Sequence, residues 1–225
     1  MQRVVPTCWD FKDWNGRMHS KIIMVSCGEA HVAIINNVGE VLTFGRGQNG
    51  RLGHGNEHDT KIPHVVQFGR TDETTRPRVS NICCGLKHTL ALSEDHKVYS
   101  WGFGKPGSLG LCHKKTRGLR RQDALKPEHV LYLDGYRTKV ISAGAHHSIF
   151  IVGGVGHALS CGYGDSGQLG RICEGSDDTP LPVEMPEGEA ICHVASGYSH
   201  TIVLCENNHV YSFGSNEHVS KYIFP

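Results

Sequence analysis

One short pattern recurs four times along this chain and constrains its fold more than any other feature. A glycine, two variable residues and a histidine are followed about seventeen residues later by a second glycine. The first glycines lie 57, 59 and 53 residues apart, a period that suits one small multi-stranded sheet per unit. The sequence therefore predicts a repeat array in which each unit buries its apolar face against its neighbours.

Each unit carries two β-rich segments joined by a turn. The first segment begins at the histidine, as in His88–Leu92, and the second ends at the later glycine, as in Val98–Gly102. The second segment places a small hydroxyl residue between larger ones in every copy, which is typical of a half-buried strand in one register. Together the segments predict an all-β fold built from hairpins.

A glycine-rich segment follows the second strand in the first three units, and each copy contains Gly-x-Gly-x-x-Gly. A dinucleotide-binding loop needs this motif between a strand and a helix, with an acidic residue about 20 positions further on. Here the motif recurs in register with the repeat, so its glycines are interpreted as turn residues between strands. No cofactor is predicted.

The combined pattern resembles the repeat of the regulator of chromosome condensation family. The matching residues read Gly-x-x-His-Thr, then Val-Tyr-Ser-Trp-Gly-x-Gly-x-x-Gly-x-Leu-Gly, then Pro and Val. The resemblance covers nearly the whole chain and implies a β-propeller of four-stranded blades, normally about seven in a closed ring. Residues 1–225 are expected to form a single array of about four blades, in units of approximately 6–62, 63–126, 127–181 and 182–217.

Four blades cannot close such a ring in the usual way, and both ends of the chain interrupt a repeat. The first and last blades are expected to leave unpaired strand edges and an uncovered blade face. Three explanations remain open. The chain is a fragment or shortened isoform of a longer propeller, or another chain supplies the missing blades, or the ring closes in a smaller form.

Net charge and cysteine content limit the kinds of partner, and the cellular compartment, that the sequence predicts. Lys and Arg number 23 against 22 Asp and Glu, so the net charge of +1 provides no overall attraction to nucleic acid or an anionic membrane. Nine cysteines without a signal-peptide pattern favour a cytoplasmic or nuclear location. No apolar stretch approaches the roughly 18 residues of a membrane helix, so no membrane association is expected.

The repeat residues are interpreted as structural. Four of the 16 histidines share one slot, which one structural hydrogen bond per blade would explain. His54 and His58 lie in a predicted loop instead of on a helix, so no metal site is predicted there. No catalytic acid, base or nucleophile is identified. The structural repeat residues are Gly28, His31, Gly85, His88, Gly144, His147, Gly197 and His200.

One connection departs from the repeat in length and charge. Residues 113–126 hold six basic residues and one acidic residue, a net of +5, whereas the next connection, residues 174–189, holds six acidic residues and no basic one. Neighbouring blades are therefore expected to present opposite charge. The candidate partner-binding residues are Lys114, Lys115, Arg117, Arg120 and Arg121.

This basic connection has several interpretations. It is a solvated loop, a contact for an acidic protein surface, or a contact for nucleic acid or a nuclear import receptor. Base stacking on single-stranded nucleic acid is weakly supported, because no aromatic residue interleaves with the charges.

The sequence supports two functions of different classes. The first is a non-catalytic propeller scaffold that binds a partner protein through its loops. The second, implied by the family resemblance alone, is guanine-nucleotide exchange on a Ran-like small GTPase, which works by preferential binding of the nucleotide-free GTPase. The founding family member uses an inserted β-wedge that is not identifiable in this sequence, so no exchange residues are assigned.

Overall fold

The computed structural model describes residues 21–69, 76–112, 123–153 and 156–217, and the structural statements below concern these residues. They form fifteen β-strands and two short 3-10 turns, η1 (Gln48–Gly50) and η2 (Leu131–Leu133). None of the helical segments in these ranges is long and apolar enough to cross a membrane. The all-β fold class predicted from the sequence is confirmed.

The strands form four antiparallel sheets, which we call blades 1 to 4. Blade 1 contains β1 (Ile22–Cys27), β2 (His31–Asn36), β3 (Val41–Gly45) and β4 (Thr60–Val65). Blade 2 contains β5 (Val79–Cys84), β6 (His88–Ser93), β7 (Val98–Gly102) and β8 (Ala124–His129). Blade 3 contains β9 (Thr138–Ala143), β10 (His147–Val152), β11 (His157–Tyr163) and β12 (Ser176–Pro182). Blade 4 contains β13 (Ile191–Ser196), β14 (His200–Cys205) and β15 (Val210–Gly214).

The strand register explains the spacing of the repeat pattern. In every blade the repeat histidine pairs across the hairpin with the second glycine, as His88 does with Gly102. Gly102 has a φ of 102°, and a Cβ there would lie 2.5 Å from the carbonyl oxygen of Lys87. Glycine is therefore required where the backbone of the preceding turn approaches the strand. The two markers of the repeat are cross-strand neighbours.

The connections between strands emerge at two opposite ends of the blades. One end carries the tight turns at the repeat glycines and the long loops between the third and fourth strands, and we call it the Gly-turn face. The other end carries the hairpins between the second and third strands and the connections between blades, and we call it the hairpin face. Strand order alone decides the face of each loop, because every blade is an antiparallel meander.

The apolar cores lie between the blades. One cluster joins Ala33 of blade 1 to Ile82 and Trp101 of blade 2, and a second joins Leu90 of blade 2 to Phe150 of blade 3. A third cluster joins blades 3 and 4. Each internal blade therefore buries both faces, one against each neighbour, as a repeat array requires.

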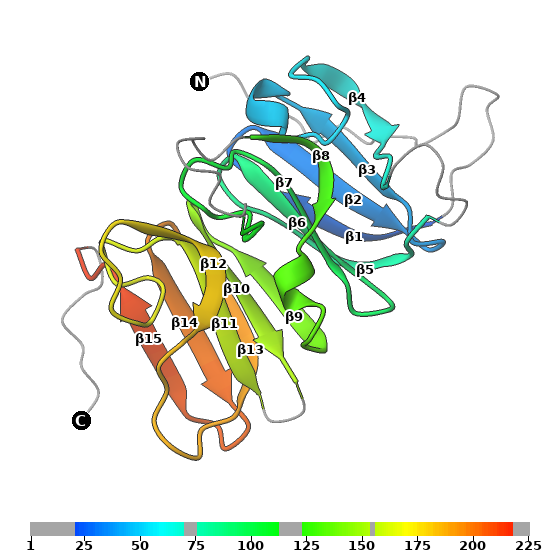
Figure 1. Ribbon diagram of the computed structural model, residues 1–225. Helices are drawn as coiled ribbons and strands as arrows, with labels where there is room; N and C mark the ends of the chain where they lie inside the picture. Colours follow the sequence, from blue (N-terminus) through cyan, green and yellow to red (C-terminus); the bar gives the residue numbers. More distant parts are fainter. Residues whose placement is uncertain (1–20, 70–75, 113–122, 154–155, 218–225) are drawn as a thin grey trace, which may run out of the picture.

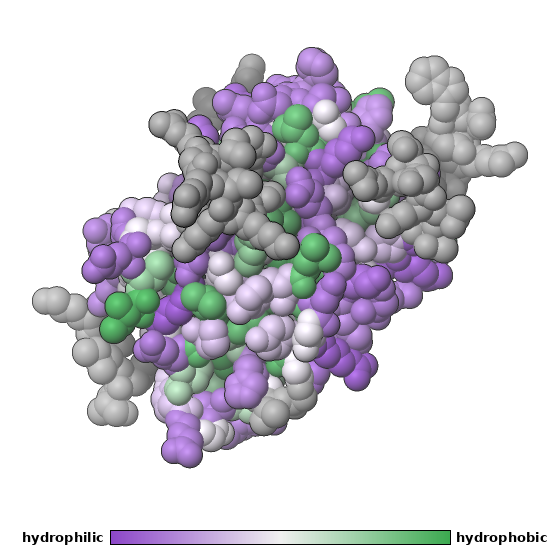
Figure 2. All heavy atoms as spheres, viewed as in Figure 1, coloured by the Kyte–Doolittle hydropathy of each residue, from purple (hydrophilic) through white to green (hydrophobic). Residues whose placement is uncertain are grey.

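On the side shown in Figure 2, hydrophilic side chains predominate and the apolar ones form separate patches.

The four blades form an open propeller array. In Figure 1 they follow one another from blade 1 at the upper right to blade 4 at the lower left. In the described residues no apolar core joins blade 4 back to blade 1. The repeat units counted along the sequence are out of phase with the blades, since their three internal boundaries fall within β4, β8 and β12.

Candidate functional site

The repeat histidines lie at the junctions between blades. At the first junction, His31 Nε2 lies 3.0 Å from the Thr89 hydroxyl of blade 2. That hydroxyl donates to the carbonyl oxygen of Arg51, in the long loop of blade 1, at 3.1 Å. His31 is 2% exposed and Thr89 is fully buried. The three residues therefore tie two blades together inside the array.

The hydrogen bonds define the protonation state of His31. A hydroxyl has one proton, and Thr89 donates it to the Arg51 carbonyl, so Thr89 accepts from His31 Nε2–H. The other ring nitrogen of His31 is buried without a partner, and a proton there would have no acceptor. Burial, followed by the nearby Arg51 charge, lowers the pKa of His31 to about 4. His31 is neutral at pH 7.

The same arrangement repeats at the next two junctions. His88 Nε2 lies 3.0 Å from the Ser148 hydroxyl, which donates to a carbonyl of blade 2 at 2.6 Å. His147 Nε2 lies 2.9 Å from the Thr201 hydroxyl, which donates to a carbonyl of blade 3 at 3.1 Å. Burial is the main cause that lowers the pKa of His88 to about 3 and that of His147 to about 4. Three neutral histidines connect the four blades in series.

The repeat glycines allow a close approach at the same junctions. A Cβ on Gly28 would lie 2.5 Å from the carbonyl oxygen of Gly85, and one on Gly85 would lie 2.5 Å from that of Gly144. A Cβ on Gly144 would lie 2.7 Å from the carbonyl oxygen of Gly197. Around Gly197 itself, the three nearest atoms belong to the ring of His200. The glycines and histidines of the repeat therefore serve the junctions between blades.

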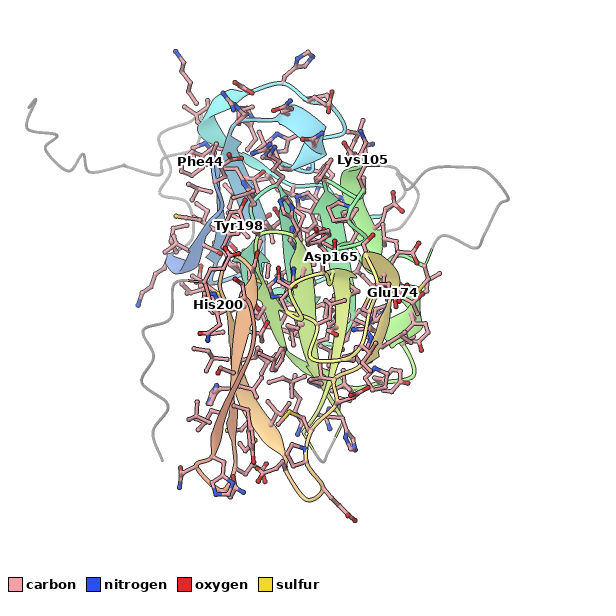
Figure 3. All side chains as sticks on the ribbon, turned by 90° about the vertical axis from the view of Figure 1, so that its left-hand side faces the viewer. Phe44, Lys105, Asp165, Glu174, Tyr198 and His200 are labelled. Carbon is pink, nitrogen blue, oxygen red and sulfur yellow. The ribbon has the colours of Figure 1, made fainter. Side chains whose placement is uncertain are left out.

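His200 occupies the repeat slot at the open end of the array. It is half-buried, and its ring has no hydrogen-bond partner among the described residues. In Figure 3, His200 and Tyr198 lie near the upper end of the blade 4 sheet. The environment of this histidine therefore differs from that of its three counterparts.

A continuous strip of side chains crosses blades 2 to 4 on the Gly-turn face. The Lys87 ammonium lies 6.0 Å from the centre of the Phe103 ring. Phe103 contacts His146 edge-on, with ring centres 6.3 Å apart, and His146 contacts Tyr198 edge-on at 6.2 Å. Tyr198 is 64% exposed and the other three are partly exposed. We call these four residues the aromatic strip.

The aromatic strip is an amphipathic surface with one permanent charge. Burial, and then the neighbouring Lys87 charge, lowers the pKa of His146. At pH 7 His146 is neutral, which leaves Lys87 as the cation of the strip. Sequence reasoning missed this strip because its members come from three repeats. They all lie beside a repeat glycine or histidine, so a comparison of those flanking positions would have found them.

The basic candidates Lys114, Lys115, Arg117, Arg120 and Arg121 lie outside the described residues. The connection that contains them joins β7 to β8, and both of these strand ends lie on the Gly-turn face. Asp123 accepts hydrogen bonds from the Asn49 side chain at 2.8 Å and from the Gly104 backbone at 3.0 Å. This carboxylate anchors the end of the connection to the loops of blades 1 and 2. Partner binding by the basic residues stays a prediction.

The acidic stretch of residues 174–189 does not form one surface patch. Strand β12 runs through its middle, so Glu174 lies on the Gly-turn side and Glu189 follows on the hairpin side. Asp177 within the strand pairs with Arg171 at 3.1 Å. Glu189 accepts from His209 at 2.8 Å. The acidic residues of this stretch are therefore divided between the two faces, and opposite charge on neighbouring blades stays a prediction.

The histidines near the blade 1 loop contribute to packing. His54 Nε2 lies 2.8 Å from the Thr43 hydroxyl, and its ring contacts that of His64 edge-on at 5.8 Å. Within the described ranges, no group of three or more His, Cys, Asp or Glu residues is arranged to hold a metal ion.

Curated relatives share the repeat across most of this chain. Ultraviolet-B receptor UVR8 of Arabidopsis thaliana is 30% identical over 197 residues, which make up 88% of this chain and 42% of UVR8. E3 ubiquitin-protein ligase HERC2 of Homo sapiens is 33% identical over 208 residues, which make up 91% of this chain and 4% of HERC2. The chain therefore spans less than half the length of these relatives.

Solved structures have the same fold. Human WBSCR16 superimposes with a TM-score of 0.75 at 21% identity, over 90% of this chain and 49% of that chain. Prp20p from Saccharomyces cerevisiae, described together with its binding properties to Gsp1p and histones, superimposes with a TM-score of 0.68 at 25% identity. That match covers 86% of this chain and 45% of Prp20p.

Family models match the repeats directly. The model of the regulator of chromosome condensation (RCC1) repeat matches residues 38–92, 95–151 and 156–204, and a second RCC1 repeat model matches residues 191–218. These matches cover well over half of the chain and agree with the blades seen in the structure. The chain belongs to the RCC1 repeat family.

Proposed function

We propose that this chain is a non-catalytic propeller scaffold that binds a partner protein through its Gly-turn face. The observation that supports the proposal is the aromatic strip, which runs across three blades and remains accessible. Aromatic side chains favour protein interfaces because they bury a large area at a small cost in conformational entropy. The packed blades beneath them hold these side chains in a fixed arrangement.

The basic residues of the β7–β8 connection would add charge to the same face. Their connection begins and ends on the Gly-turn face, beside the blade that contributes Lys87 and Phe103. Positive charge beside an apolar strip suits a partner whose surface combines apolar and acidic residues. The proposed partner is therefore a protein with an acidic margin around an apolar contact.

The experiment compares two pairs of aromatic residues on opposite faces. Phe103→Ser with Tyr198→Ser disrupts the aromatic strip. The matched control is Tyr132→Ser with Tyr136→Ser on the hairpin face, where these tyrosines are 39% and 41% exposed and stack on each other. The immobilised variants are exposed to cell extract, and the recovered proteins are quantified. We expect the first pair to lose bound proteins that the control keeps, and equal recovery by both would reject the proposal.

A second candidate function is guanine-nucleotide exchange on a Ran-like small GTPase. It is supported by the similarity to Prp20p, which is described together with its binding to Gsp1p. The test measures release of fluorescent GDP from the GTPase at micromolar concentrations of the folded chain. Accelerated release would support exchange. Unchanged release would reject exchange and leave the scaffold proposal intact.

A further inference from the structure

A cleft of about 350 Å³ opens at the junction between blades 1 and 2. Its wall comes from the β3–β4 loop and from β4 of blade 1, and Lys126 of β8 completes it. The Gly55 amide donates to the Leu125 carbonyl oxygen at 2.8 Å, which holds the loop beside Lys126. The cleft shares no residue with the aromatic strip and is therefore separate from the binding site proposed above.

No carboxylate is present among the described residues that line this cleft. The β3–β4 loop carries two acidic residues, and both bond to backbone amides of the same loop. Glu57 accepts from the Asn49 amide at 2.7 Å, and Asp59 accepts from the Gly47 amide at 2.8 Å. The negative charges of the loop are therefore engaged outside the cleft.

The exposed side chains of the cleft are hydrogen-bond donors. Asn56 Oδ1 accepts from the His58 amide at 2.9 Å, which leaves the NH2 group of Asn56 for a ligand. Burial lowers the pKa of His54, so this ring is neutral at pH 7 and Lys126 is the permanent cation. The exposed donors are Asn56, His58, His64, Gln67 and Lys126.

Blade 3 has an internal ion pair at the corresponding positions. His54 and Arg171 both follow the Leu-Gly step of their repeats. His54 Nε2 lies 2.8 Å from the Thr43 hydroxyl, and Arg171 donates to the Ser160 hydroxyl at 2.5 Å. Arg171 also pairs with Asp177 at 3.1 Å. In blade 3 the chain itself therefore supplies the anion for its basic side chain.

Thr60 occupies in blade 1 the position that Asp177 occupies in blade 3. Thr60 pairs with the repeat glycine Gly45, and Asp177 pairs with the repeat glycine Gly162. The Thr60 hydroxyl is buried and has no hydrogen-bond partner among the described residues. Blade 1 therefore surrounds this position with basic and amide side chains and lacks the acid.

Blade 2 fills the same two positions with apolar residues. Leu111 packs against the cores on both sides of the blade, and Ala124 is 2% exposed. An ion pair in blade 3 and apolar packing in blade 2 each complete the structure internally. The set of donors without an acid therefore belongs to blade 1 and is no general feature of the repeat.

We propose that this cleft binds a phosphate group, either as free phosphate or as the monoester of a small molecule, with Lys126 as its counter-ion. Donors from several side chains suit an ion with at least three acceptor oxygens, and a lysine binds phosphate as a point charge. A carboxylate offers two oxygens in one plane, which suit the guanidinium fork that blade 3 provides with Arg171.

NMR titration tests the site directly. The ring signals of His58 and His64 are recorded while inorganic phosphate or glycerol 3-phosphate is added at constant pH and ionic strength. We expect both signals to shift and to reach saturation. Lys126→Gln should weaken binding about tenfold or more, because it removes a charge-assisted hydrogen bond.

The matched control removes the same charge from a neighbouring position of β4. Lys61 is exposed and follows Thr60 in the strand, but it does not line the cleft. Lys61→Gln should change the affinity by less than about twofold, since solvent screens a charge outside the site. Equal losses for Lys61→Gln and Lys126→Gln would show general attraction to a basic surface and would overturn the proposal.

A second variant restores the acid of blade 3. Thr60→Asp places a carboxylate at the position of Asp177, and we expect it to abolish phosphate binding by repulsion between like charges. Thr60→Ser keeps the hydroxyl and should retain binding. Thermal unfolding of both variants establishes that they are folded.

The choice of anion defines the ligand. Tighter binding of glycerol 3-phosphate than of inorganic phosphate would identify an ester, and equal or weaker binding would identify the free ion. Malonate, a dianion with two carboxylates, should bind about tenfold more weakly than either. Absence of saturation with both phosphates, equal affinity for malonate, or full binding by Thr60→Asp would overturn the proposal.

Discussion

Blades 3 and 4 carry the same repeat in different surroundings. Ile149 is fully buried, whereas Ile202 at the same position is 41% exposed. His147 bonds to the Thr201 hydroxyl, whereas His200 has no such partner among the described residues. Residues of one type in one register therefore differ in burial and pairing according to the next blade. In a repeat array the neighbouring unit, more than the strand itself, decides the environment of a residue.

The largest expected effect lies at an internal junction. Trp101 is fully buried, and its indole N–H donates to the Arg51 carbonyl at 3.0 Å. Trp101→Ala should lower the free energy of unfolding by about 3–5 kcal/mol, because it empties a large buried site. Phe213→Ala, at the same repeat position in blade 4, should cost less because Phe213 is only partly buried. Denaturant unfolding of both variants measures the difference. Equal losses in the free energy of unfolding would show that the two positions do not differ as their burial predicts.

A more closely matched pair uses one residue type at one repeat position. Ile149→Ala should lower the free energy of unfolding by about 2–4 kcal/mol, since it leaves a cavity between blades 3 and 4. Ile202→Ala should cost under about 1 kcal/mol, because much of that side chain already contacts solvent. Urea unfolding checks both values. A large loss for Ile202→Ala would mean that its face is covered in solution.

Backbone contacts at the repeat glycines also differ between an internal blade and blade 4. A methyl group at Gly85 would meet the Gly144 carbonyl of the next blade, so Gly85→Ala should destabilise the chain by about 1–3 kcal/mol. At Gly197 the three nearest atoms all belong to the half-buried His200 ring, and no carbonyl oxygen of a next blade is among them. Gly197→Ala should therefore lower the thermal midpoint less. The opposite order would show that blade 4 is the more constrained of the two.

Stability should also depend on pH, because each internal junction buries a neutral histidine. Burial lowers the pKa values of His31, His88 and His147 to about 4, 3 and 4, against 6.5 in an unfolded chain. As the pH falls below 6.5, the unfolded chain takes up protons that the folded chain does not. Stability is therefore complete above pH 6.5 and declines towards pH 4. Unfolding midpoints at pH 7 and pH 5 measure this decline.

A variant assigns part of that decline to one histidine. His88→Gln should be less stable than the natural chain at pH 7, because Gln does not reproduce the imidazole packing. Its further loss between pH 7 and pH 5 should be smaller, since one titrating group is absent. An equal loss in both proteins would exclude a contribution from His88.

The sequence was sufficient to predict the all-β propeller repeat. Strand alternation and turn glycines follow local rules, and Gly102 illustrates this with a φ of 102° that other residues rarely adopt. The candidate site was less accessible to sequence reasoning. Phe103 and His146 belong to different repeats and meet only across a junction. The acidic stretch looked continuous along the chain, yet β12 separates its two ends.

The sequence by itself determined the unit of this protein: the hairpin register, the glycine at each close approach and the histidine that faces the next blade. These features depend on short-range geometry within one repeat. The tertiary structure alone decided which neighbour each unit meets. It paired His31 with Thr89, joined residues of three blades into the aromatic strip and left His200 at an open face. Such contacts depend on the lateral packing of whole sheets, which no single repeat encodes.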